Sequence, residues 1–106
     1  MLIMLQNIKN NNTPLEYTVA GLSLGPARCR ILASNVSENN SLTALHLARK
    51  GITDEDGIEL ARMLHDNKVL RKLELEGNLL GPKSVKCFGE ALKINKTLKV
   101  LDLESN

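Results

Sequence analysis

The sequence predicts an α/β solenoid, with a short parallel sheet on its concave side and helices on its convex side. Spaced leucines recur every 28 residues, so that Leu42, Leu70 and Leu98 hold equivalent positions. Each leucine cluster alternates apolar and polar residues as a short strand does, and apolar residues at helical spacing follow it. A fixed period of this length is the signature of stacked structural repeats.

This period predicts a single domain over residues 1–106. Its segments are a half repeat or N-terminal helix, a degenerate repeat, two regular repeats and the start of a further repeat, at residues 1–13, 14–41, 42–69, 70–97 and 98–106. Because the chain starts in a predicted helix and stops on a predicted strand, it is either complete with an open end or a segment of a longer array.

The first two segments carry the weaker form of the pattern. Apolar residues within 1–10 have helical spacing, which predicts a helix that covers the first full repeat, with a frayed start as the alternative. Residues 15–19 alternate as a strand does. Gly25-Pro26 fits a helix start, because proline in the first turn lacks only an N–H that would have no partner.

The two regular repeats follow one plan. A strand at 45–47 precedes a helix from about Asp54, which begins with the capping residue Thr53 and three acidic residues at the positive end of the helix dipole. The next repeat enters its helix through Gly81-Pro82. The side chains expected to face the core are Ile58, Leu60, Ala61 and Leu64 in the first helix and Val85, Phe88, Gly89 and Leu92 in the second.

Small residues and asparagines also recur with the period. Ala33, Ala61 and Gly89 predict a point where the helix and strand layers approach closely. Asparagine follows each helix, where it tolerates the left-handed cap conformation, at Asn39, Asn67 and Asn95. A second asparagine is expected to satisfy the backbone groups of the strand-to-loop turn. It is present as Asn78 and Asn106 but replaced by Leu22 and Lys50.

The skeleton Leu70-x-x-Leu73-x-Leu75-x-x-Asn78-x-Leu80, with a following helix that ends in Leu-x-x-Asn, resembles the leucine-rich repeats of the ribonuclease-inhibitor-like type. The resemblance is strong over residues 42–106 and weaker before them. A uniform spacing of 28 is also similar to the repeats of nucleotide-binding immune receptors, Ran GTPase-activating proteins and tropomodulins. It implies a horseshoe fold, but these families share no function, so the resemblance does not select one.

Strand alternation identifies the candidate site. Leucines of each strand point into the core, so the residues between them point to the concave face. The concave face of a solenoid is an extended binding surface, and we expect it to contact another protein with a basic or mixed-charge surface. A solvated strand face with compensating charges is the alternative. The candidate partner-binding residues are Thr18, His46, Lys72, Glu74, Glu76, Asp102 and Glu104.

Enzymatic and cofactor functions find no support in the sequence. It has no nucleophile elbow and no phosphate-binding glycine loop, so we expect neither catalysis nor a cofactor. His46, Glu74 and Asp102 are metal-binding residue types, but a single row does not converge on one ion, so no metal is expected. His65 lies near a helix C-terminus, where a cation is favoured.

Neither nucleic acid nor a membrane is an expected partner. The net charge is only +2, and the lysines of residues 83–99 lack accompanying aromatic residues for base stacking. No apolar run approaches the length of a membrane span, which is about 20 residues. Cys29 and Cys87 fall on different helices and predict unpaired thiols. With no secretory signal, this favours an intracellular location, and the cytoplasm in particular.

Three functions therefore stay open. The first is a non-enzymatic protein-interaction module or scaffold. The second is a regulator of an enzyme such as a small GTPase, which would need an arginine on a strand-to-helix loop; Arg49 is the arginine near such a position. The third is a segment of a larger receptor or scaffold array. In each case, the open strand at residues 101–103 invites self-association.

Overall fold

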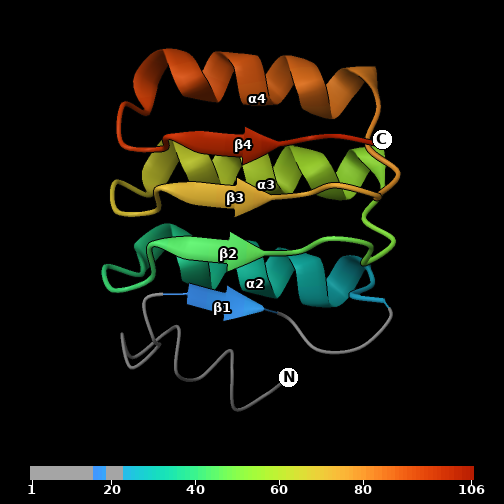
Figure 1. The fold of residues 1–106 in the computed structure, drawn as a ribbon, viewed down its shortest axis with the longest axis horizontal. Helices are drawn as coiled ribbons and strands as arrows, with labels where there is room; N and C mark the ends of the chain where they lie inside the picture. Colours follow the sequence, from blue (N-terminus) through green and yellow to red (C-terminus); the bar gives the residue numbers. More distant parts are fainter. Residues whose placement is uncertain (1–15, 19–22) are drawn as a thin grey trace.

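The computed structural model describes residues 16–18 and 23–106, so the predicted helix within 1–10 lies outside the described residues (Figure 1). Strands and helices alternate along the chain. They are β1 (Glu16–Thr18), α2 (Pro26–Glu38), β2 (Ala44–His46), α3 (Asp54–Asp66), β3 (Lys72–Glu74), α4 (Pro82–Ile94) and β4 (Val100–Asp102).

The four strands form one parallel sheet in the order β1-β2-β3-β4. Its register pairs each residue with its repeat equivalent, for example Leu45 with Leu73 and Leu73 with Leu101. Figure 1 shows the helices following one another in the same order as the strands, with α2 and α3 behind the sheet. The predicted α/β solenoid is therefore confirmed, with one strand and one helix per repeat.

Leucine fills the core of this small domain. Leu45 and Leu73 of the strands and Leu60 and Leu64 of α3 are fully buried, and Phe88 of α4 is 1% exposed. They belong to one continuous apolar cluster that runs through the repeats. Because every repeat offers an equivalent space between its strand and its helix, one side-chain type fills each of them, and few aromatic residues are needed.

The asparagine after each helix does not adopt the predicted left-handed conformation. Asn67 has φ −75° and ψ 131°, which is extended backbone. Its side-chain Nδ2 donates to the carbonyls of Val36 at 2.7 Å and Asn39 at 3.1 Å, in the preceding repeat. Its Oδ1 accepts from the N–H groups of Val69 at 2.8 Å and Leu70 at 2.7 Å. The side chain, rather than the backbone, ends the helix and joins it to the repeat before.

Asn95 repeats this arrangement one period later. Its Nδ2 donates to the carbonyls of Leu64 at 2.7 Å and Asn67 at 2.9 Å, and its Oδ1 accepts from Thr97 and Leu98. Asn67 and Asn95 are 1% and 2% exposed. Each amide thus uses both donors and its acceptor inside the protein, where an unsatisfied polar group is costly.

The second asparagine position satisfies the strand-to-loop turn as predicted. Asn78 Nδ2 donates to the carbonyls of Leu47 and Leu75, each at 2.9 Å, and its Oδ1 accepts from the N–H groups of Lys50 and Ile52. Asn106 acts in the same way on Leu75 and Leu80.

Lys50 stands where the turn asparagine is missing. There its backbone carbonyl accepts from the N–H of Leu24 at 3.0 Å. This N–H is equivalent to the Ile52 and Leu80 N–H groups that bind asparagine Oδ1. A main-chain oxygen therefore replaces the amide oxygen in the earlier repeat.

The expectation that Val85 and Gly89 face the core is wrong, and Gly89 does not mark a close approach of the helix and strand layers. A close approach lies instead between α3 and the next repeat at Gly57, where an added Cβ would meet Leu80 Cδ2 at 2.5 Å and Ser84 Cβ at 2.6 Å. Val85, one repeat after Gly57, is 49% exposed instead of facing the core. Gly89 has open space where a Cβ would lie. Val85 and Gly89 are equivalent to Gly57 and Ala61, which face the repeat of α4, and the described residues contain no helix after α4.

The C-terminal end of the core is open for the same reason. Leu98, Leu101 and Leu103 are only partly buried, whereas their equivalents one repeat earlier, Leu70, Leu73 and Leu75, are fully buried. The described residues end with β4 and its turn, so no further strand or helix covers these leucines within them.

Successive helices are capped in two different ways. Thr53 caps α3 within its own repeat, because its Oγ1 accepts from the N–H of Asp56 at 3.3 Å, as the sequence predicted. The start of α4, at Gly81-Pro82, is capped instead by Asp54 of the preceding repeat. Its Oδ1 accepts from Gly81 N–H at 3.0 Å and from the Ser84 N–H and hydroxyl at 2.8 and 2.6 Å. These bonds from Ser84 hold the pKa of Asp54 below its usual range.

No helix in the described part of the chain is long and apolar enough to cross a membrane.

We predict that Asn67→Ala lowers the free energy of unfolding by about 2–4 kcal/mol, since each buried group left without a partner costs about 1–3 kcal/mol. The measurement is urea denaturation followed by circular dichroism. The matched control is Lys68→Ala at the exposed neighbouring position, which should change stability by less than about 0.5 kcal/mol. A loss for Asn67→Ala as small as that of the control would contradict the bridging role of the amide.

Candidate functional site

The candidate site lies on the sheet face that points away from the helices, called here the concave face. The parallel register brings Thr18, His46, Glu74 and Asp102 into one row across β1 to β4. A second row contains Glu16, Ala44, Lys72 and Val100. These rows follow directly from the repeat spacing, because equivalent residues pair across a parallel sheet.

His46 is the centre of a charged cluster on this face. Its Nδ1 lies 2.6 Å from Glu74 Oε2 on β3, and its Nε2 lies 3.1 Å from Glu16 Oε1 on β1. Lys72 Nζ lies 2.9 Å from the other oxygen of Glu74. The imidazole therefore bridges the strands on both sides of β2, and Glu74 contacts His46 through one oxygen and Lys72 through the other.

The pKa values within this cluster shift in the directions expected of ion pairs. The hydrogen bond with Glu74 is the main cause that raises the pKa of His46, and Glu16 adds to it. The same contact, followed by that with Lys72, lowers the pKa of Glu74. Glu74 in turn raises the pKa of Lys72. Each charged form thus favours the others.

The C-terminal part of the concave face is acidic and lacks such pairing. Glu76 and Glu104 follow β3 and β4, and Asp102 lies in β4. Within the described residues, none of these three carboxylates forms an ion pair with a lysine, arginine or histidine. Glu76 Oε2 is buried and has no hydrogen-bond donor among residues 16–18 and 23–106, and Asp102 Oδ1 accepts from the N–H of Glu104 at 2.9 Å.

The predicted site residues therefore divide into two groups. His46, Lys72 and Glu74 come together, while Glu76, Asp102 and Glu104 lie beyond them toward the C-terminal edge. Thr18 is exposed and outside the cluster. Glu16 belongs to the cluster but was not among the predicted site residues. Its position two residues before Thr18 puts it on the same face. The side chain of Glu16 is longer than that of Thr18 and reaches His46 on the neighbouring strand, although the two residues are not directly opposite each other.

Arg49 lies on the loop between β2 and α3. Its backbone is left-handed, with φ 54°, and its side chain is exposed. It lies against Gly77 of the next repeat, where an added Cβ would meet Arg49 Cγ at 2.6 Å. The glycine thus leaves room for the arginine side chain at the edge of the concave face.

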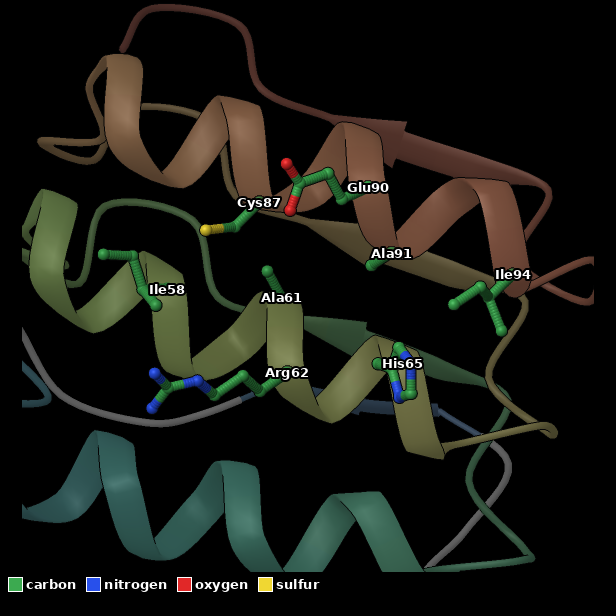
Figure 2. Close-up of a pocket in the computed structure, with 8 residues that line it drawn as sticks. All are labelled: Ile58, Ala61, Arg62, His65, Cys87, Glu90, Ala91 and Ile94. Atoms are coloured by element: carbon green, nitrogen blue, oxygen red, sulfur yellow. The ribbon is translucent and has the colours of Figure 1, made fainter.

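A groove of about 380 Å³ lies on the opposite side of the molecule, between α3 and α4 (Figure 2). Ala61 and Ala91 face each other across it, and Ile58, Cys87 and Ile94 extend its apolar lining. The groove between α2 and α3 is about 220 Å³ and has charged or larger residues at the equivalent positions, including Arg30, Glu59, Met63 and Asp66. The two grooves differ in volume and polarity because the residue type changes at these equivalent positions from one repeat to the next.

Both cysteines are free and lie on different helices, as predicted. Cys29 is fully buried in α2, and burial raises the pKa of its thiol to about 12. Its Sγ lies 3.8 Å from the carbonyl of Asp56. Cys87 of α4 is only partly buried and lines the groove. The described residues contain no group of three histidine, cysteine or acidic side chains that could hold a metal ion.

We predict that a thiol reagent such as 5,5′-dithiobis(2-nitrobenzoate) titrates one thiol of the folded chain at about pH 8. That thiol is Cys87, because a thiol with a pKa of about 12 holds roughly one thiolate in ten thousand at this pH. The second thiol should react only after unfolding in guanidinium chloride. Cys87→Ser should abolish the fast reaction and Cys29→Ser should retain it; the reverse pattern would contradict the burial of Cys29.

Known proteins share this architecture. A family model described as a leucine-rich repeat matches residues 38–61. Among solved structures, leiomodin-1 actin-binding site 2 superposes with a TM-score of 0.90 at 24% identity, over 96% of this chain and 60% of that chain. The tropomodulin C-terminal domain of Caenorhabditis elegans superposes with a TM-score of 0.85 at 16% identity, over 96% of this chain and 62% of that one.

These similarities concern the fold. At such identities the two structures share an architecture with this chain, and the chain spans about 60% of the length of each. The family match identifies a leucine-rich repeat at residues 38–61, and these similarities do not distinguish the ribonuclease-inhibitor-like type.

Proposed function

We propose that this leucine-rich-repeat protein is a non-enzymatic interaction module that binds another protein through its concave strand face. The observation that carries the proposal is the contrast between the two parts of that face. Around His46 the charges compensate one another, whereas Glu76, Asp102 and Glu104 form no direct ion pair with a lysine, arginine or histidine among the described residues. A surface whose charges are left uncompensated favours a complementary partner.

The accessibility of two of these carboxylates supports the same proposal. Glu104 is exposed and Asp102 is half-buried. A lysine or arginine of a partner could therefore pair with them through charge-assisted hydrogen bonds. The proposed partner therefore presents basic groups to the C-terminal part of the concave face. It also contacts the adjacent cluster around His46, in which the charges compensate one another.

Actin is the first partner to test, because one of the structural neighbours is an actin-binding site of leiomodin-1. We predict that the double substitution Asp102→Lys and Glu104→Lys weakens binding about 10- to 100-fold, which corresponds to roughly 1.4–2.8 kcal/mol. The measurement is isothermal titration calorimetry at two salt concentrations. Binding should weaken as salt rises, since Glu104 is exposed and Asp102 is partly exposed to solvent.

The matched control is Lys86→Glu and Lys93→Glu on the exposed side of α4, which should leave the affinity unchanged. If this control abolishes binding while the concave substitutions do not, the partner binds the helical side instead. Light scattering over a concentration range belongs to the same experiment. The exposed Val100 and the partly buried leucines at the open end make self-association through β4 the competing interaction.

A regulator of a small GTPase is the second candidate, and the exposed Arg49 on its strand-to-helix loop is the observation that favours it. Such a regulator inserts an arginine that stabilises the charge of the phosphoryl-transfer transition state. Under this candidate, the chain accelerates GTP hydrolysis in a single-turnover assay, and Arg49→Ala removes the acceleration. No acceleration across a panel of small GTPases would reject it and leave the interaction module.

A further inference from the structure

The two ring nitrogens of His46 both face carboxylate oxygens. Nδ1 lies 2.6 Å from Glu74 and Nε2 lies 3.1 Å from Glu16. An ionised carboxylate only accepts hydrogen bonds, so each contact needs an N–H on the ring. A neutral imidazole has one N–H and the imidazolium has two. The observed arrangement therefore fits the protonated ring and cannot be satisfied by the neutral one.

We propose that His46 is a proton-dependent switch on the concave face: the protonated ring joins β1 to β3 across β2, and deprotonation releases Glu16 to solvent. The inference deepens the proposed function, because it concerns the same face and the charge that a partner would meet there. The proposed switch uses only contacts within this chain, so it can operate without a bound partner.

The surroundings of the ring decide which carboxylate is released. Glu74 is held by Lys72 through its second oxygen, at 2.9 Å, and its side chain is 23% exposed. The side chain of Glu16 is 69% exposed. A neutral His46 therefore keeps its proton on Nδ1 and its bond to Glu74. The lone pair of Nε2 then points at Glu16, which moves into water at little cost.

The charged groups that face His46 come from the strands on both sides. They are Glu16 of β1 and Glu74 of β3, with Lys72 of β3 acting through Glu74. Thr18, which pairs with His46 in the row, does not titrate, and Asp102 lies two strands away. With His46 protonated, two cations balance two carboxylates. Loss of the proton leaves one carboxylate uncompensated, so the whole concave face becomes more acidic.

The direction of the pH dependence follows from the raised pKa of His46. The stabilisation by the cluster is fully present below the unfolded value, which is about 6.5. It is lost as the pH rises through the folded pKa, which lies above that value. The switch therefore operates on the alkaline side of the ordinary histidine range.

Nuclear magnetic resonance of the imidazole nitrogens in the free chain tests the proposal. Below the transition we expect both nitrogens of His46 to carry a proton, and above it only Nδ1. His65, which contacts neither glutamate, supplies a reference signal in the same spectra. In Glu74→Gln the midpoint for His46 should move to lower pH, and in Glu16→Gln it should move in the same direction by less.

Glu104→Gln, on the same face but outside the cluster, is the matched control and should leave the midpoint unchanged. The proposal is overturned if the proton of the neutral ring resides on Nε2, or if Glu74→Gln and Glu104→Gln titrate alike. The wild-type tautomer decides the question even if a variant fails to fold. Because no partner is present, failure here would leave the proposed binding function standing.

Discussion

One buried asparagine amide joins each of the repeats at residues 42–69 and 70–97 to the repeat before it. Asn67 and Asn95 donate to two carbonyls of the preceding repeat and accept from two N–H groups of their own. Without them, the ends of α2 and α3 would leave buried carbonyls with no partner, since helix termini always leave backbone groups unpaired. The strands can then be short, because the turn is fixed by side chains rather than by a long ladder. A sheet held in this way presents its outer rows in register, and the His46 cluster depends on that register.

The repeat spacing was sufficient to predict the strand order, the rows of the concave face and the leucine core. These follow from a period of 28 because equivalent residues pair across a parallel sheet. The spacing could not predict what happens at the ends of the array. Val85 and Gly89 occupy positions that face a following helix, so their burial depends on whether one is present. The left-handed conformation predicted for the asparagines after the helices was also wrong. The rule behind it describes isolated helix ends and takes no account of contacts with the neighbouring repeat.

The candidate site illustrates the same limit at finer scale. Alternation identified His46, Glu74 and Lys72 as neighbours on one face, but it could not show that His46 contacts Glu16 rather than its row partner Thr18. That contact is diagonal and depends on the length of the glutamate side chain. Pairing rules describe residues directly opposite each other, whereas long side chains also reach the next position along the strand. The division of the concave face into a compensated and an uncompensated part depends on such contacts.

Capping across repeats also bears on how the chain folds. Asp54 supplies the hydrogen bonds for the start of α4, whereas α3 is capped by its own Thr53. Repeat arrays fold by nucleation in one unit and growth through nearest-neighbour interfaces. When folding extends from α3 to α4, the Asp54 cap and the packing of the two helices form in one step. These two units therefore form a cooperative pair. Unfolding should then proceed in blocks rather than one repeat at a time. The Asn67 amide also joins α2 to α3, but the shared cap of Asp54 is additional, so α2 should separate before α3 and α4 do.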